Sequence, residues 1–147
     1  MNVNIRKIEK KDYPAVLNLI KELALFERAP EKVTNTVELM NEEENYFQSL
    51  VAEDEKGDII GMAIFFFAYF TWVGKSLYLD DIVVSEKYRG NKIGTKLLEK
   101  VVEFGKQNNC KRIRWQVLDW NVEAIEFYRK YGASLDGEWI NCDMEGF

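Results

Sequence analysis

Residues 88–98 read YRGNKIGTKLL, a basic turn with two glycines that stands between two apolar segments. The residues before it, 77–84 (LYLDDIVV), are mostly apolar and predict a buried strand. The residues after it, 93–108, carry apolar side chains at helical spacing and predict an amphipathic helix. The first N–H groups of a helix lack intrahelical partners and carry partial positive charge. A strand, turn and helix of this composition are therefore suited to bind a phosphate group.

A P-loop is the competing interpretation of the same turn. That motif needs four residues between its glycines and ends in Gly-Lys-Ser/Thr. Here three residues separate Gly90 from Gly94, and the order that follows is Gly94-Thr95-Lys96. The spacing excludes a P-loop, but a plain surface turn with solvated Arg89 and Lys92 stays open for the motif taken alone.

The rest of the chain predicts an alternation of strands and helices around this turn. The order β-α-α-β-β-β-α-β-α indicates a mixed α/β sheet with helices on its faces. Asn35 and Glu38 resemble a capping pair for the second helix, and Gly132 a left-handed cap that ends the last one. The expected strands are 3–8, 49–53, 59–69, 77–84 and 112–117, and the expected helices begin at Asp12, Asn35, Ile93 and Val122.

Composition narrows the functional classes. The 147 residues suit a single domain, 1–147, and a net charge of −5 argues against nucleic acid or an anionic membrane as partner. The chain has no histidine, which removes Ser-His pairs and His-bound metals, and no metal is expected. Two isolated cysteines and no apparent leader favour the cytoplasm. A small cationic substrate fits this charge.

Three motifs together resemble the GNAT N-acetyltransferase superfamily, in its diamine acetyltransferase branch of spermidine/spermine and thialysine enzymes. They are Arg89 to Gly94, Tyr78-Leu79-Asp80-Asp81 before it, and Trp120-Asn121 followed by Phe127-Tyr128. Lys92 stands where the family usually has its first glycine. The resemblance covers roughly Ile5 to Gly132. It implies a GNAT fold with a mostly antiparallel sheet, acetyl-CoA as donor, a small-molecule amine as acceptor and a homodimer.

The resemblance also implies which residues meet coenzyme A. The turn would cradle the pyrophosphate, the strand before it would pair with the pantetheine amides, and the last helix would contact the pantetheine arm and sulfur. These cofactor-binding candidates are Ile82, Val83, Val84, Arg89, Gly90, Asn91, Lys92, Ile93, Gly94, Thr95, Asn121, Ala124 and Tyr128.

Chemistry at the acceptor requires a neutral amine, although an alkyl ammonium is protonated at pH 7. By resemblance, Asp80 takes that proton directly or through water, and Tyr128 protonates the departing thiolate. Strand alternation places Asp80 and Asp81 on opposite faces. The substrate-binding candidates are Phe26, Glu27, Trp72, Asp80 and Asp81.

Two other functions stay open on the sequence. A non-catalytic acyl-CoA-binding sensor would keep the turn without turnover. An acetyltransferase for protein lysines or N-termini would need an open groove beside the same residues. One or two side chains can redirect acceptor specificity, so the sequence does not name the amine.

Overall fold

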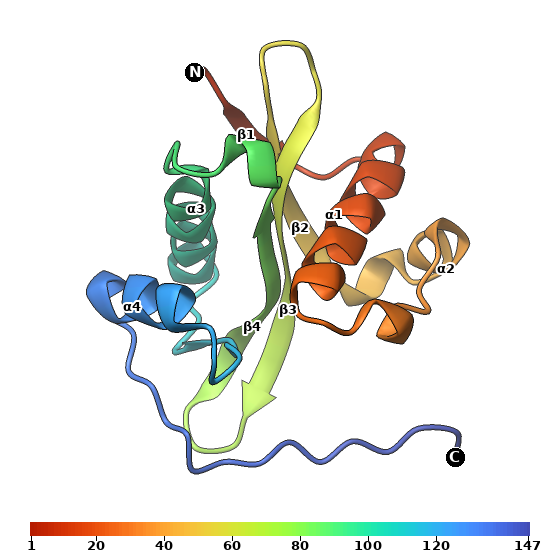
Figure 1. Ribbon diagram of the computed structural model, residues 1–147. Coiled ribbons are helices and arrows are strands. Elements are labelled where there is room, and N and C mark those ends of the chain that lie inside the picture. Colours follow the sequence, from red (N-terminus) through yellow and green to blue (C-terminus); the bar gives the residue numbers. More distant parts are fainter. The chain divides into compact units, whose positions relative to one another are not determined.

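A computed structural model describes residues 1–147, which form two compact units, Met1–Gln116 and Val117–Phe147 (Figure 1). The second unit contains α4 (Val122–Tyr131). The first contains β1 (Asn4–Lys7), α1 (Tyr13–Phe26), α2 (Val37–Glu42), β2 (Gln48–Glu53), β3 (Ile59–Phe70), β4 (Gly74–Val84), α3 (Ile93–Gln107) and β5 (Ile113–Arg114). Short 3-10 helices lie at Lys10–Asp12, Pro30–Lys32, Glu44–Tyr46 and Glu86–Tyr88. None of the helices has the length and apolar character that a membrane span requires.

The sheet follows the chain order β1-β2-β3-β4-β5. All neighbours pair antiparallel except β4 and β5, which are parallel because α3 crosses between them. The expected mixed, mostly antiparallel sheet is confirmed, as is the element order.

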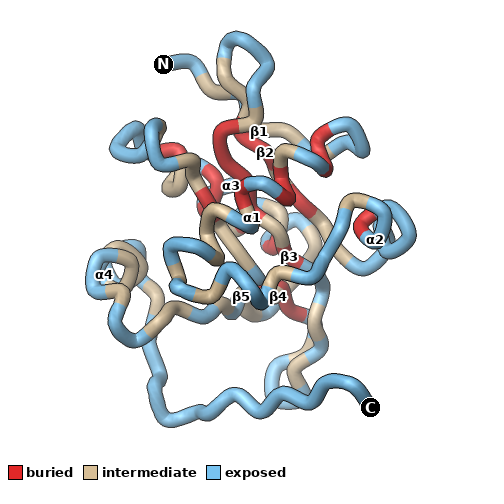
Figure 2. The backbone as a smooth tube through the Cα atoms, turned by 45° about the vertical axis from the view of Figure 1, so that its right-hand side comes forward, coloured by how far each residue is buried: buried red, intermediate tan, exposed pale blue.

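Helices α1 and α3 cover opposite faces of this sheet (Figure 1). Met62 packs in one cluster with Val16 and Leu17 of α1. A Cβ on the adjacent Gly61 would lie 3.3 Å from Leu97 Cδ1 of α3, so glycine allows α3 to approach closely. Because side chains alternate along a strand, neighbouring residues 61 and 62 face opposite layers. Buried residues, red in Figure 2, gather on the sheet and the inner sides of the helices, whereas residues 134–147 are exposed.

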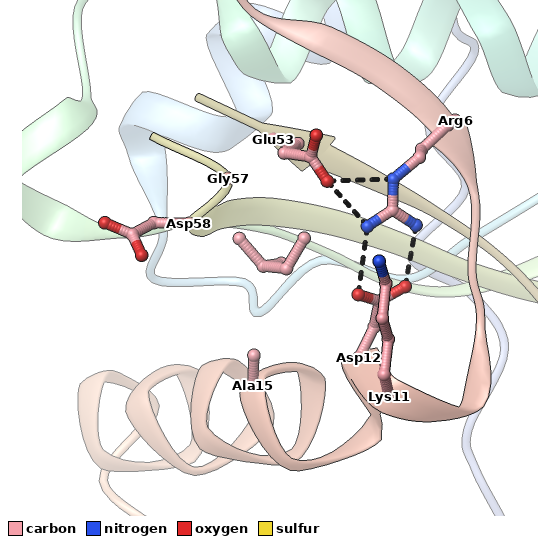
Figure 3. Close-up of a pocket in the computed structure, with 8 residues that line it drawn as sticks. Arg6, Lys11, Asp12, Ala15, Glu53, Gly57 and Asp58 are labelled. Carbon is pink, nitrogen blue, oxygen red and sulfur yellow. Dashed lines mark hydrogen bonds and ion pairs between the residues drawn. The ribbon is translucent and has the colours of Figure 1, made fainter. Parts of the chain in front are cut away.

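An ion-pair network fixes the outer strand to the start of α1 (Figure 3). The Arg6 guanidinium donates to both Asp12 oxygens, at 2.7 and 3.0 Å, and to Glu53 Oε2 at 2.7 and 3.0 Å. The Asp12 side chain is only 5% exposed. Hydrogen bonding from Arg6 holds the pKa of Asp12 below its usual value. The polar pocket around these residues is therefore organised by bonds within the protein, which tie β1 and β2 to α1.

Two local expectations were wrong. The strand expected over 112–117 is limited to Ile113–Arg114. The second helix is capped by Thr36, whose hydroxyl accepts from Leu39 N at 3.1 Å, while Asn35 accepts from Thr36 N. Threonine and asparagine are both favourable N-cap residues, so the residue types alone did not show which of the neighbours Asn35 and Thr36 caps the helix. The left-handed cap at Gly132 is confirmed by its φ of 105°.

Candidate active site

A β-bulge in β4 brings two acidic side chains together. Leu79 is opposite Phe65 and Asp81 is opposite Ile64, so Asp80 has no partner on β3. The extra residue interrupts strand alternation, and bulges of this kind re-aim side chains. Asp80 and Asp81 were expected on opposite faces, but they lie within electrostatic range of each other. The expectation was wrong because strict alternation requires a regular strand.

These carboxyl groups bind protons more strongly than usual. Burial, with the charges of Asp80 and Glu27 added, raises the pKa of Asp81 to about 7. Partial burial of its carboxyl group also raises the pKa of Asp80, although the residue as a whole is exposed. Burial and then the charge of Asp80 raise the pKa of Glu27, at the end of α1. Three carboxyl groups without an internal cation form a site suited to a positively charged ligand.

The structure gathers some of the predicted acceptor residues and leaves one apart. Glu27 follows α1 and interacts electrostatically with both aspartates. Its neighbour Phe26 is 45% exposed, and the Arg89 guanidinium lies 5.7 Å from its ring. Trp72 is 83% exposed in the turn between β3 and β4. A strand advances 3.3 to 3.4 Å per residue, so about 20 Å of β4 separates this turn from Asp80. Trp72 therefore lies away from the carboxylates.

The turn after β4 presents the uncapped start of α3. Lys92, the N-cap residue, is left-handed with a φ of 59°, and Gly90 has a φ of 86°. No side chain caps the helix and no acidic residue stands in its first turn. The first intrahelical bond runs from Lys96 N to Lys92 O, at 3.0 Å. The earlier N–H groups of Ile93, Gly94 and Thr95 have no such partner and are available to an anion.

Side-chain contacts hold this turn in place without filling it. Asn91 Nδ2 donates to Tyr88 O at 2.9 Å, and Arg89 Nε donates to Val84 O at 3.3 Å. A Cβ on Gly94 would meet only Val84 Cγ2, at 3.8 Å, which is ordinary contact. Packing within the protein therefore does not require glycine at this position. The glycine leaves open space directly at the helix start.

One edge of β4 is free beside the turn. Strand β5 pairs with β4 only at Leu77 and Tyr78. Residues Ile82, Val83 and Val84 pair with β3 on one side and with no strand on the other. An extended backbone with a free edge can accept an extended ligand as an added strand.

In the second unit, the start of α4 agrees with the sequence prediction. Asn121 Oδ1 accepts from Ala124 N at 3.2 Å, which confirms Asn121 as the N-cap. Ala124 and Tyr128 are four residues apart and share one side of the helix. The Tyr128 ring contacts the Phe127 ring edge to face, with centroids 5.3 Å apart.

A model of the acetyltransferase (GNAT) family matches residues 3–133 of this chain. The chain belongs to the GNAT acetyltransferase family. The matched residues run from β1 past α4 and thus through both compact units. The expected family, fold class and enzyme class are confirmed.

Two named acetyltransferases are similar to this chain in sequence, and a solved structure is similar to it in fold. The chain is 34% identical to mouse thialysine N-epsilon-acetyltransferase over 159 aligned positions, covering 99% of this chain and 94% of that protein. It is 26% identical to the Bacillus subtilis spermine/spermidine N(1)-acetyltransferase, covering 94% and 91%. An integron cassette protein from the mobile metagenome of V. cholerae has the same fold, with a TM-score of 0.79, 24% identity and coverage of 99% and 94%.

GNAT enzymes use acetyl-CoA, and the turn residues fit its pyrophosphate. The uncapped N–H groups of α3, the space at Gly94 and the nearby Arg89 supply donors, room and positive charge. The glycine turn and the family resemblance predicted these residues from the sequence, and their role stays a prediction. The sequence did not predict that Asp81 lies beside Asp80 and Glu27, because that arrangement depends on the bulge.

The left-handed Lys92 leads to a stability prediction for this GNAT domain. A non-glycine residue in this conformation costs about 1–2 kcal/mol. We expect Lys92→Gly to raise the free energy of unfolding by about 1 kcal/mol, because glycine adopts positive φ without that cost. Denaturant unfolding measures the change. Lys92→Ala is the control, since it removes the charge and keeps the Cβ. Equal stability of the two variants would contradict the prediction.

Proposed function

We propose that this chain transfers the acetyl group of acetyl-CoA to the primary amine of a small cationic substrate. The candidate acceptors are diamines, polyamines and lysine-like amino acids such as thialysine. The observation that carries the proposal is the carboxyl cluster of Glu27, Asp80 and Asp81, which holds negative charge in one place without an internal cation. The names of the mouse and Bacillus relatives support the same class of acceptor.

The proposed donor site runs from the β4 edge to the start of α3. Acetyl-CoA supplies the acetyl group as an activated thioester. The backbone of Ile82 to Val84 would bind the pantetheine amides through its free edge. The turn from Arg89 to Thr95 would bind the pyrophosphate. Asn121, Ala124 and Tyr128 of α4 would contact the pantetheine arm and the sulfur.

The proposed reaction is a direct attack within a ternary complex. Asp80, directly or through water, accepts one proton from the substrate ammonium, with Asp81 beside it. The freed amine forms a C–N bond to the acetyl carbon as the C–S bond breaks. The nitrogen loses a second proton to water as the amide forms, and Tyr128 donates a proton to the departing sulfur and recovers one from solvent. Of the two protons that leave the ammonium, the balance is then one on the CoA thiol and one released to solvent.

We also propose that residues 1–147 form one GNAT domain. The protein would work in the cytoplasm as a homodimer and act on a small molecule. The family match through both units supports a single domain. Both cysteines, Cys110 and Cys142, are free, which suits a reducing compartment.

The test is release of CoA by the purified protein from acetyl-CoA in the presence of different amines. The panel contains thialysine, lysine, diamines, spermidine and short lysine peptides. We expect turnover with at least one small amine. Turnover with the peptides alone would move the function to protein acetylation. Tight binding of CoA without turnover on any amine would favour a sensor.

A further inference from the structure

The C-terminal part of α1 contacts the turn that precedes α3. Glu22 Oε1 accepts a hydrogen bond from Glu86 N at 2.9 Å, and the Arg89 guanidinium lies 5.7 Å from the centre of the Phe26 ring. Glu22 and Phe26 are four residues apart and therefore share one side of α1. Glu86 begins a 3-10 helix of which Arg89 is the C-cap. One side of α1 thus contacts both ends of this short helix.

The hydrogen bond to Glu22 fixes the backbone where β4 leads into the turn. The N-cap residue Ser85 makes no side-chain bond to the 3-10 helix. The Glu22 carboxylate takes that role from a different element, and a hydrogen bond to a charged acceptor is stronger than a neutral one. Arg89 N donates to Glu86 O at 3.2 Å, so the backbone of Arg89 is tied to the same point. The base of the Arg89 side chain is therefore held in place through α1.

Two contacts orient the Arg89 side chain. Its Nε donates to Val84 O at 3.3 Å, and its guanidinium lies over the Phe26 ring. Val84 lies at the start of α3, because its Cγ2 would be only 3.8 Å from a Cβ on Gly94. The guanidinium is therefore held near the uncapped N–H groups of α3, on an exposed residue that a ligand can reach.

Phe26 orients the guanidinium without occupying its hydrogen-bond donors. No carboxylate forms an ion pair with Arg89, and the bond to Val84 O is the one hydrogen bond of its side chain. An aromatic ring attracts a cation through its face and offers no oxygen atom to the N–H groups. The Nη groups keep their donors for a phosphate oxygen. A carboxylate in place of the ring would neutralise Arg89 and compete with the phosphate.

We propose that Phe26 is a positioning residue of the donor site, which holds the Arg89 guanidinium for the pyrophosphate of acetyl-CoA. The inference rests on the proposed function, in which the turn from Arg89 to Thr95 binds this pyrophosphate. It gives Phe26 a role toward the donor in place of the acceptor role that the family resemblance implies. Its neighbour Glu27 belongs to the carboxyl cluster, so adjacent residues at the end of α1 serve the two substrates.

The test is calorimetric titration with CoA in the absence of an amine, so that a contact of Phe26 with the acceptor does not enter. Phe26→Leu should weaken CoA binding about twofold to fivefold, the size of an exposed cation–π contact. Phe26→Tyr keeps a ring and should bind CoA as the wild-type protein does. Arg89→Gln should weaken binding about tenfold. Leu25→Ala, at an exposed neighbour on α1, is the control and should change nothing.

The deciding variant combines Phe26→Leu with Arg89→Gln. If the ring acts through the guanidinium, Phe26→Leu should cause no further loss of CoA affinity once Arg89 is replaced. A loss as large as in the wild-type background would overturn the inference, and so would unchanged affinity in Phe26→Leu or in Arg89→Gln alone. Phe26 is 45% exposed, so its replacement leaves the core intact, and denaturant unfolding checks this.

Steady-state kinetics separates this inference from the proposed acetyl transfer. In Phe26→Leu the KM for acetyl-CoA should rise while the KM for the amine stays unchanged. A rise in the KM for the amine alone would return Phe26 to the acceptor site and leave acetyl transfer standing. If the wild-type protein binds CoA but acetylates no amine, acetyl transfer is overturned and the titrations still decide the role of Phe26. Absence of CoA binding by the wild-type protein would overturn both.

Discussion

Replacement of Tyr128 by phenylalanine is expected to lower kcat by a factor of about 10² to 10⁴. The variant keeps the ring that packs against Phe127 and removes only the hydroxyl group. The departing thiolate would then leave without a proton donor, so the loss appears in the chemical step. Affinity for CoA should change little, because the variant loses one hydroxyl group while the proposed pyrophosphate contacts and the other pantetheine contacts are kept. Steady-state kinetics and calorimetric CoA titration measure the two quantities.

Tyr131→Phe is the matched control, since it removes a hydroxyl group from the same helix, α4. It should retain the wild-type rate. A wild-type rate in Tyr128→Phe would exclude Tyr128 as the acid. An equal loss in both variants would indicate that α4 is disturbed as a whole.

Replacement of Asp81 by asparagine is expected to make the protein more stable at pH 8. The pKa of Asp81 is about 7 in the folded protein against 3.8 for the ordinary group. The folded state therefore holds the proton more tightly, and stability falls as the pH rises from about 4 to 7. A difference of about three units corresponds to a ceiling of about 4 kcal/mol. Asparagine removes this cost, so the gain should be full at pH 8 and vanish near pH 4.

Asp58→Asn, in the exposed turn between β2 and β3, is the control and should change stability little. The activity of Asp81→Asn should fall, because the ammonium loses one of its carboxylates. In the wild-type protein, kcat/KM should rise through about pH 7 as Asp81 ionises, and this step should be absent in the variant. Denaturant unfolding between pH 4 and 8 tests the stability claim. Equal stability at every pH would contradict it.

Much of the site was predictable from local sequence signals. The spacing of Gly90 and Gly94 after an apolar strand indicated the helix start that the structure shows. Asn121 before an amphipathic segment indicated the N-cap of α4, which is confirmed. Both signals depend on residues within one turn of each other, so they can be recognised in the sequence without knowledge of the tertiary packing.

The bulge at Asp80 was not predictable. It depends on the register between β3 and β4, where Leu79 and Asp81 are opposite consecutive residues of the partner strand. No glycine or proline marks it in the sequence. The length of β5 likewise depends on where the pairing with β4 ends, after Tyr78. Trp72 is exposed because it lies in the turn at the end of the β3–β4 hairpin. Its aromatic side chain gave no indication of this position in the sequence.

Lys92 shows how a departure from a family pattern can be explained physically. Residue 92 is a lysine at a position where the family usually has a glycine. The structure places it in the left-handed region, with a φ of 59°, where glycine carries no steric cost. The turn thus holds a non-glycine residue in a strained conformation, and the lysine adds a positive charge beside the helix start.

The most direct test of acetyl transfer to an amine is to follow both products in one reaction. Purified protein is mixed with acetyl-CoA and L-lysine, or with the best amine of the panel. Released CoA is measured by a thiol assay and the amine by mass spectrometry. The account predicts one mono-acetylated amine for each CoA released. Release of CoA without acetylated amine, or no reaction with any amine, would contradict it.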